Sequence, residues 1–392
     1  MNEKRLLIVL AAIQFTNILD FMIMMPLGPQ LMRIFDISPA QFSALVSAYT
    51  FSAGIVGFAA AFFIDRFERR SMLLMVYAGF ILGTLACALS PGYTWLLASR
   101  VFTGAFGGML GALVLSVVGD VIPVERRGLA MGKIMAAFSA ASVMGVPFSL
   151  FIAAQTNWHA PFFFLSLAGL VIWFGIYKAV PAVNSSHSQV QLKPMQIISA
   201  VVHQRNLRTT LFLMMVMMLG NFTITPFISP TMVANVGFSE GQLTYIYLFG
   251  GFITLFSSPW IGKLADKYGP AKVFTAFVLI SIVPIIMITN LKPMPIPLVL
   301  MLTSTYFVVS GGRMIPAQAM ITSAVKPEMR GSFMSLNTAV QQLSTAAAAF
   351  IAGLIMVRNP DGTLSNYPYV GMLSIALCLL SIPIARRVKL VA

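Results

Sequence analysis

Charged residues are scarce in this sequence. Asp, Glu, Lys and Arg make up 9% of the chain and hydrophobic residues 58%, whereas soluble domains carry about 25% charged and about 45–50% apolar residues. This composition excludes a soluble globular protein. The apolar runs are about 20 residues or longer, the length that an α-helix needs to cross a bilayer. A β-barrel would show alternating segments of about ten residues instead, so we expect an all-α membrane protein.

Residues that carry catalytic or metal chemistry are also rare. The two cysteines, Cys87 and Cys378, fall within expected spans, which gives no disulfide framework. The three histidines, His159, His187 and His203, fall in loops or at helix ends, and no cluster with metal-ligand spacing falls within a span. The sequence also has no glycine-rich phosphate loop ending in Lys-Ser/Thr. We therefore expect no enzyme, no metal site, no cofactor and no direct use of ATP.

The charge that is present is mostly basic, with 25 Lys and Arg against 11 Asp and Glu. In a soluble protein this excess would suggest nucleic acid, but here it follows the expected topology. With twelve spans and a cytoplasmic N-terminus, 20 of the 25 basic residues lie inside, and only Arg33, Lys292 and Arg358 lie outside. Because cytoplasmic loops of membrane proteins are enriched in Lys and Arg, we expect both termini inside and no nucleic-acid partner.

Short polar breaks divide the chain into twelve apolar spans. The one long break, residues 181–207, is predicted to be a cytoplasmic linker between six-helix bundles at residues 1–180 and 208–392. A shift of 201 residues superimposes the two halves. For example, Ser38-Pro-Ala-Gln41 falls on Ser239-Glu-Gly-Gln242, and each has the Ser and Gln of a capping box. We therefore expect two pseudo-symmetric bundles with a cavity between them at the membrane midplane.

Residues 262–272, Gly-Lys-Leu-Ala-Asp-Lys-Tyr-Gly-Pro-Ala-Lys, resemble the loop signature of the major facilitator superfamily. Residues 64–70 are similar to it in the first half, with Ala61 in place of the usual leading glycine. The resemblance covers essentially the whole chain and implies a transporter that works by alternating access. It also implies a conformational gating role for Asp65, Arg66, Arg69, Arg70, Gly262, Asp266 and Lys267. The alternative is a solvated turn whose basic residues only set the topology.

Glycines in the fourth and fifth spans carry two further resemblances. Arg100-Val-Phe-Thr-Gly104 is similar to the intramembrane arginine motif of the superfamily, and small residues at four-residue spacing, such as Gly104 and Gly108, let helices touch closely. Gly145 and Pro147 partly resemble the glycine-proline motif of drug-type antiporters, although Val146 separates them. This implies a gating role for both residues, and a simple kink is the alternative.

Asn17-Ile-Leu-Asp20 in the first span resembles the acidic motif of proton-coupled drug exporters. Asp20 is the one carboxylate expected near the centre of a span. Burial favours its neutral form and a neighbouring Arg100 favours its charged form, so the group can gain and lose a proton. We expect Asp20 and Arg100 to form a proton-coupling site; a purely structural hydrogen bond is the alternative.

The first, fourth, seventh and tenth spans are expected to line the substrate cavity. Candidate ligands of the substrate are Asn17, Asn221, Arg313 and Gln318. Asn221 falls opposite Asp20 under the 201-residue shift, and Arg313 is a cation deep in the tenth span. One carboxylate against two arginines predicts neutral or anionic substrates. A contact between Arg313 and backbone carbonyls at a proline break is the alternative.

These features predict a secondary transporter that couples proton entry to efflux (antiport) of a small amphipathic molecule. The resemblance implies a monomer in a bacterial-type inner (plasma) membrane, with the small-molecule substrate, protons and the lipid bilayer as its partners. A uniporter or a proton-coupled importer of a small metabolite, sugar or lipid-like molecule would use the same fold. A membrane receptor or lipid-active enzyme is the alternative from another class, and the sequence offers no catalytic cluster for the latter.

Overall fold

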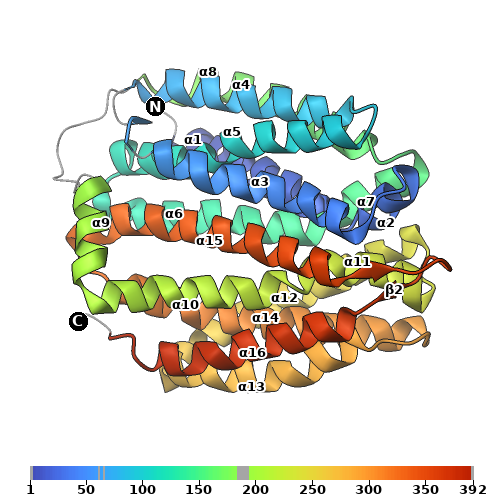
Figure 1. Ribbon diagram of the computed structural model, residues 1–392. Coiled ribbons are helices and arrows are strands. Elements are labelled where there is room, and N and C mark those ends of the chain that lie inside the picture. The colour runs from blue at the N-terminus through green and yellow to red at the C-terminus, as the bar shows by residue number, and fades with distance from the viewer. Residues whose placement is uncertain (1–2, 61, 65–66, 183–193, 390–392) are drawn as a thin grey trace. The chain divides into compact units, whose positions relative to one another are not determined.

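The computed structural model describes residues 3–60, 62–64, 67–182 and 194–389. These residues are almost entirely helical (Figure 1). Within them, eleven helical segments are long and apolar enough to cross a membrane. A further helix of 26 residues, α12 (Leu243–Tyr268), occupies the position of the expected eighth span. The expected all-α membrane fold is confirmed.

The chain forms two compact units. The first comprises Met1–Met24 and Ala48–Val190, and the second comprises Met25–Ser47 and Gln191–Ala392. Residues 25–47 thus come from the first half of the sequence but pack within the second unit. The sequence repeat and the packing units therefore divide the chain at different points. Within the linker expected at residues 181–207, residues 183–193 lie outside the described residues, and residues 194–203 form a helix.

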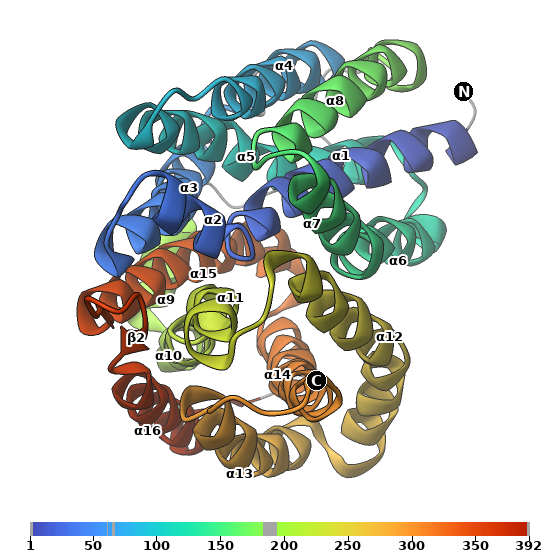
Figure 2. The same ribbon diagram turned by 90° about the vertical axis from the view of Figure 1, so that its right-hand side faces the viewer.

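The first unit is built around α1. Its helices are α1 (Glu3–Ile23), the later part of α3 (Pro39–Ala60), α4 (Arg69–Ala88), α5 (Tyr93–Val121), α6 (Val124–Ala140), the π-helix η2 (Ala141–Gly145), α7 (Val146–Gln155) and α8 (Ala160–Ala179). Helix α1 packs against α5, α6 and α8, and α4 packs against α5 and α8. Figures 1 and 2 show α4 and α8 side by side. Fully buried Leu10, Val76 and Leu113 represent the core that these helices share.

The fifth span changes its helical winding just before a proline. Pro147 has no backbone N–H and its ring crowds the preceding turn, which disturbs regular α-helical bonding. The residues before it form η2, a short π-helix in which the Val146 N–H donates to the Ala141 carbonyl. Gly145 completes η2 and packs against Leu19 of α1, where a Cβ would lie 3.0 Å from the leucine methyls. The glycine-proline pair thus produces a local irregularity against α1.

The second unit contains the remaining elements. They are α2 (Gly28–Ile34), the first part of α3, α9 (Pro194–His203), α10 (Arg205–Phe222), η3 (Thr225–Phe227), α11 (Ile228–Thr231), η4 (Met232–Val236), η5 (Glu240–Gln242), α12, α13 (Pro270–Thr289), α14 (Ile296–Ser323), α15 (Pro327–Ile355), β1 (Val357–Arg358), β2 (Leu364–Ser365) and α16 (Tyr367–Ala385). Helix α14 packs against α12 and α13, and α10 packs against α15 and α16. Strands β1 and β2 form an antiparallel ribbon with Val357 opposite Ser365.

Both predicted capping boxes are present. The Ser38 hydroxyl accepts from the Gln41 N–H at 3.2 Å, and the Gln41 side chain accepts from the Ser38 N–H at 2.9 Å. Ser239 and Gln242 repeat this exchange at 3.3 and 2.9 Å. Each box satisfies two backbone donors that a helix start leaves free. The sequence repeat thus corresponds to a repeated local structure.

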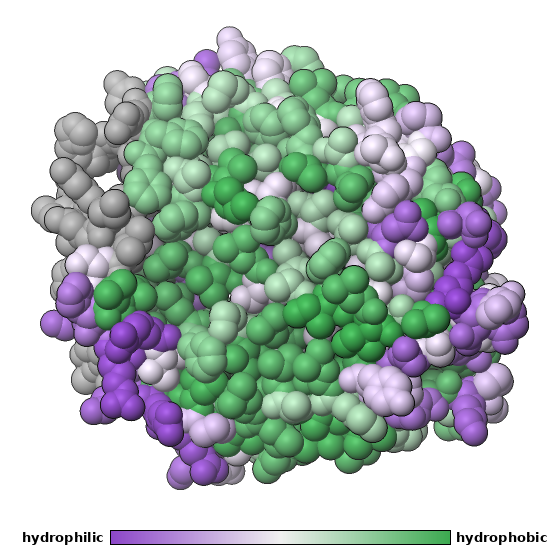
Figure 3. Space-filling view, in the orientation of Figure 1, coloured by the Kyte–Doolittle hydropathy of each residue, from purple (hydrophilic) through white to green (hydrophobic). Residues whose placement is uncertain are grey.

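Large apolar side chains cover much of the surface. Figure 3 shows hydrophobic residues across the middle of one face and hydrophilic ones gathered toward its left and right ends. Phe174, Phe256 and Met301 are at least 60% exposed. Soluble proteins rarely expose large contiguous apolar areas, whereas lipid chains cover them without cost. The surface therefore agrees with the spans assigned from helix length.

Candidate functional site

One ion pair of the first unit is fully buried. Arg100 of α5 donates through Nη1 to Asp20 Oδ2 of α1 at 2.6 Å, and neither side chain is exposed. Thr84 of α4 donates to Asp20 Oδ1 at 3.2 Å. Helices α1, α4 and α5 therefore meet at the one carboxylate that the sequence places deep in a span. The structure brings together the two residues predicted to couple protons.

Tyr49 of α3 completes this cluster, and sequence reasoning missed it. Its ring centroid lies 4.5 Å from Arg100 Cζ, a cation–π distance. Its hydroxyl donates to Asn17 Oδ1 at 2.7 Å, and Asn17 Nδ2 donates to the Gly107 carbonyl at 3.2 Å. The amide of Asn17 thus joins α1 to α3 and α5. The only sequence signal was a tyrosine within the second span, which does not distinguish a site residue from a packing residue.

The guanidinium of Arg100 is not saturated by protein acceptors. Its Nε and Nη2 atoms are buried and have no hydrogen-bond partner among the described residues. Buried polar atoms are almost always hydrogen-bonded in folded proteins. Arg100 is therefore held by one carboxylate and one aromatic face, and it depends on Asp20 for its charge balance.

The buried arginine of the second unit has neutral partners. Arg313 of α14 is 4% exposed. Its Nη2 donates to Asn221 Oδ1 of α10 at 3.2 Å and to Ser310 Oγ at 3.1 Å. Its Nη1 lies 2.6 Å from Cys378 Sγ of α16. Asn221 and Arg313, both predicted to bind substrate, are therefore in contact. Gln318 lies further along α14 and is not among the side chains that contact Arg313.

The repeat places Asp20 and Asn221 in corresponding positions, and each contacts a buried arginine. Asp20 and Asn221 are 201 positions apart, as the sequence repeat requires. The two arginines are not repeat counterparts, because Arg100 and Arg313 are 213 positions apart. The first unit thus has a carboxylate where the second has an amide. Only the first arrangement places a carboxylate beside its arginine.

The predicted gating residues of the first half are only partly described. Arg69 is buried and donates through Nε to Asp120 Oδ2, near the end of α5, at 2.7 Å. Arg70 lies with Cζ 4.7 Å from the ring centroid of Tyr177 on α8. The sequence analysis did not single out Asp120 as a partner of Arg69, so this contact was missed. Asp65 and Arg66 lie outside the described residues.

The corresponding residues of the second half end α12. Asp266 and Lys267 are exposed, and Lys267 Nζ lies 5.2 Å from the ring centroid of Tyr268. A Cβ built on Gly262 would meet no atom within 4 Å. Within the second unit these residues form an open helix end. Their gating role stays a prediction.

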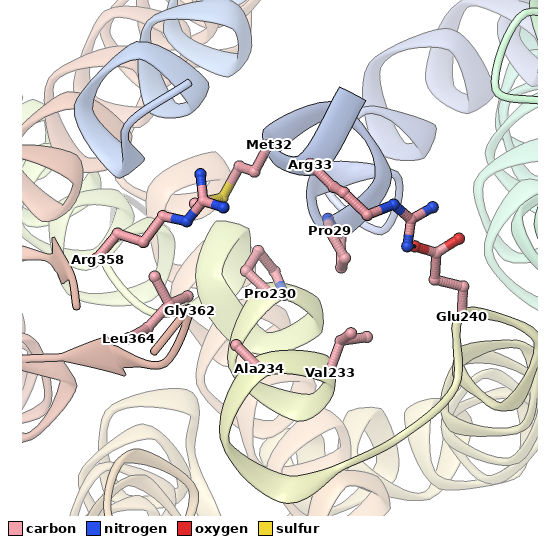
Figure 4. Close-up of a pocket in the computed structure, with 10 residues that line it drawn as sticks. All are labelled: Pro29, Met32, Arg33, Pro230, Val233, Ala234, Glu240, Arg358, Gly362 and Leu364. Carbon is pink, nitrogen blue, oxygen red and sulfur yellow. Dashed lines mark ion pairs between the residues drawn. The ribbon is translucent and has the colours of Figure 1, made fainter. Parts of the chain in front are cut away.

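A pocket of about 190 Å³ lies where α2 meets η4 and the β1–β2 ribbon (Figure 4). Arg33 of α2 points toward Glu240 of η5, with Nη1 and Oε1 2.5 Å apart (Figure 4). Arg358 of β1 also lines the pocket and donates to Asp36 Oδ1 at 2.9 Å. Two ion pairs thus tie residues 25–47 to the rest of the second unit. None of the predicted site residues lines this pocket.

Comparison with known proteins identifies the family. Residues 10–349 and 210–390 match the Major Facilitator Superfamily. The chain belongs to this superfamily. The uncharacterized MFS-type transporter YbcL of Bacillus subtilis (strain 168) is 23% identical over 316 residues, which cover 80% of this chain and 78% of that relative. As a major facilitator protein, the chain is a multi-pass membrane transporter and not an enzyme.

Solved structures of major facilitator proteins have the same fold. A bacterial homolog of the human lysosomal transporter Spinster, inward-facing and occupied, has a TM-score of 0.76 at 14% identity, covering 99% of this chain and 97% of that chain. A D-xylose-proton symporter has a TM-score of 0.75 at 16% identity, covering 97% of each chain. At these identities the likeness shows the fold alone.

Proposed function

We propose that this major facilitator protein exports a small amphipathic molecule in exchange for protons. The observation that carries the proposal is the fully enclosed Asp20–Arg100 pair in the first unit. A carboxylate inside a span is costly and usually belongs to a substrate or ion pathway. Asp20 binds a proton when the site opens to the outside and releases it when the site opens to the inside.

Protonation of Asp20 changes the balance of forces in the first unit. It removes the negative charge next to Arg100, which then keeps the Tyr49 ring as its other charge-stabilising contact. Removing one partner of a buried ion pair costs about 3–5 kcal/mol, and about 1.4 kcal/mol is tenfold in an equilibrium constant. One proton can therefore shift the balance between two conformations about a hundredfold or more.

The driving force is sufficient for export. A membrane potential contributes about 2.3 kcal/mol per charge per 100 mV, and each pH unit contributes about 1.4 kcal/mol. One proton exchanged for one neutral molecule therefore sustains a gradient of roughly 10²- to 10³-fold.

The main substrate contacts are assigned to residues of the second unit. Asn221 and Arg313 contact each other and can turn their polar atoms to a ligand. Gln318 lies on the same helix as Arg313 and is a further candidate. Asn17 is held on both sides by Tyr49 and Gly107, so it must exchange a bond before it can meet substrate.

Gating is assigned to the loop signatures and the fifth-span irregularity. The buried Arg69–Asp120 pair supports a fixed contact at one end of the first unit. Asp65, Arg66, Arg70, Gly262, Asp266 and Lys267 are proposed to act with it, and Gly145 and Pro147 let the fifth span bend. We place the transporter in a bacterial-type inner membrane as a monomer with both termini in the cytoplasm.

Transport measurements in proteoliposomes test the proposal. The purified protein is reconstituted with a pH-sensitive dye inside, and amphipathic compounds are added one at a time. Antiport predicts that a transported compound moves protons in the opposite direction, with protein-free liposomes as the control. Substrate flux without proton movement would indicate a uniporter. Protons moving with the substrate would indicate an importer, and either result contradicts the proposal.

A further inference from the structure

Arg313 is a buried cation without a buried anion. Among the described side chains of the second unit, the carboxylates of Asp36 and Glu240 pair with Arg358 and Arg33, Asp266 is exposed, and Asp361 accepts hydrogen bonds from Thr363. The groups around Arg313 are instead an amide, a hydroxyl and a thiol. A guanidinium stays protonated in proteins, and a buried charge is normally paired.

The first unit shows what this arrangement lacks. There the buried arginine, Arg100, contacts the carboxylate of Asp20 at 2.6 Å. In the second unit Asn221 is the repeat counterpart of Asp20, and it offers Arg313 a neutral oxygen at 3.2 Å. The second unit therefore has the cation of an ion pair and lacks its anion.

The groups next to Arg313 are suited to hold an anion. Tyr306, Ser310 and Arg313 are spaced at i, i+4 and i+7 on α14, which places them on one helix face. Tyr306 is 2% exposed, and its buried hydroxyl lies close to Thr225 and Ser310 without forming a hydrogen bond of good geometry among the described residues. Arg313 already donates to Ser310 Oγ on this face. A phenol donor, a hydroxyl and a guanidinium fork thus converge.

We propose that Arg313, with Tyr306, Ser310 and Asn221, binds a carboxylate group of the transported molecule. The inference rests on the proposed transport function and adds the chemical class of the substrate. A carboxylate accepts two parallel hydrogen bonds from a guanidinium, which gives both strength and orientation. The carboxylate of the substrate would take the place of Cys378 at Nη1 of Arg313 and of Asn221 at Nη2. Arg313 would then have the anion that its ion pair lacks.

A matched series of probes tests the charge. The compounds are 4-phenylbutyrate, 4-phenylbutanol and 4-phenylbutylamine, which share an apolar part and differ in the charge of the polar end. Binding is measured with the detergent-purified full chain. The thermal unfolding midpoint is followed as the concentration of each probe is raised, and the concentration that gives half of the full shift reports the affinity. The anion is expected to bind about tenfold or more tightly than the amine, because only the anion can pair with the guanidinium.

Variants of the cluster test the residues. Arg313→Gln removes the charge, Arg313→Lys keeps the charge without the fork, and Tyr306→Phe removes one donor. We expect Arg313→Gln to weaken 4-phenylbutyrate binding about tenfold or more and Arg313→Lys by less. Tyr306→Phe should weaken 4-phenylbutyrate binding severalfold. This variant still tests the site if Arg313→Gln does not fold. Gly311→Ala is the control, because a Cβ there meets no atom within 4 Å.

Three results would overturn the proposal. The first is equal binding of the anion, the alcohol and the amine. The second is unchanged 4-phenylbutyrate binding in folded Arg313→Gln and Tyr306→Phe, which would make Arg313 structural. The third is that chloride raises the thermal unfolding midpoint as much as 4-phenylbutyrate does at the same concentration, which would assign the site to a free inorganic anion. The assay contains no membrane and no proton gradient, so its failure is distinct from a failure of proton coupling.

Discussion

Two arginines lie inside the spans, and the protein stabilises each in a different way. Arg100 is held by the Asp20 carboxylate and the face of Tyr49, whereas Arg313 has an amide, a hydroxyl and a thiol around it. The first arrangement can change its net charge when its carboxylate gains or loses a proton, whereas the second has no carboxylate and can gain a negative charge by binding an anion. At the residue scale, this difference separates the proposed coupling site from the proposed substrate site.

A residue outside the spans gives a pH-dependent prediction. Glu68 accepts from the N–H groups of Arg70 and Ser71 at 3.0 and 2.9 Å and so caps the start of α4. Burial alone would raise the pKa of Glu68, but hydrogen bonds from Ser71 and Arg70 outweigh it and lower the pKa. The stabilisation by this cap is therefore complete above the unfolded pKa of about 4.3 and is lost as the pH falls through the lower folded pKa.

Substitution tests this cap. Glu68→Ala is expected to destabilise the first turn of α4 by about 0.5–2 kcal/mol at neutral pH, the usual range for a lost helix cap. Hydrogen–deuterium exchange of the Arg70 and Ser71 amides is the readout. Glu68→Gln is the matched control, because its oxygen still accepts a hydrogen bond but does not titrate. Equal exchange in the wild type and Glu68→Ala at neutral pH would contradict this role.

At the scale of elements, glycines allow α3 and α5 to pack closely within the first unit. A Cβ on Gly104 would collide with the Tyr49 carbonyl oxygen, and one on Gly108 would collide with that of Ala53. A Cβ on Gly111 would meet nothing within 4 Å. The four-residue spacing predicted such a contact, but it did not show which of the glycines makes it. That depends on the rotation of α5 relative to its neighbour.

This contact predicts a graded response to substitution. Gly108→Val should lower the thermal unfolding midpoint, because forcing atoms into a packed interface costs about 1–3 kcal/mol. Gly111→Ala should leave the midpoint unchanged or slightly higher, since alanine favours helix. Both variants are measured in the same detergent. If Gly108→Val is as stable as Gly111→Ala, the helices are not held at this point.

At the scale of the whole molecule, the sequence predicted the spans well for a physical reason. Backbone groups in a bilayer must bond internally, so each long apolar run becomes a helix. The contact of Asp20 with Arg100 was also predicted, because few polar residues fall within the spans. Asp120 and Tyr49 were missed because contacts between helices depend on helix rotation, which composition does not reveal. The packing of residues 25–47 with the second unit is a similar property of tertiary structure.

Topology is a prediction of the whole chain. The 20 basic residues expected inside, against three outside, predict that the start of α10 faces the cytoplasm and the β1–β2 turn faces outward. Single cysteines at the exposed Gln204 and Pro360 test this, since the native Cys87 and Cys378 are buried. An impermeant thiol reagent added to intact cells should label Pro360→Cys and spare Gln204→Cys. The reverse pattern would contradict the assigned orientation.

The central claim is that Asp20 carries the coupled proton, and Asp20→Asn tests it most directly. Asparagine has nearly the same shape, occurs at the corresponding position 221 of the second half, and cannot hold a proton at this site. The measurement follows proton movement and substrate accumulation in proteoliposomes with an imposed pH gradient, using a compound that the wild type transports. We predict that Asp20→Asn still exchanges substrate at equal pH, moves no protons on substrate addition and accumulates nothing from the pH gradient, whereas Gly111→Ala behaves as the wild type. Proton movement in Asp20→Asn equal to that of the wild type would contradict the account.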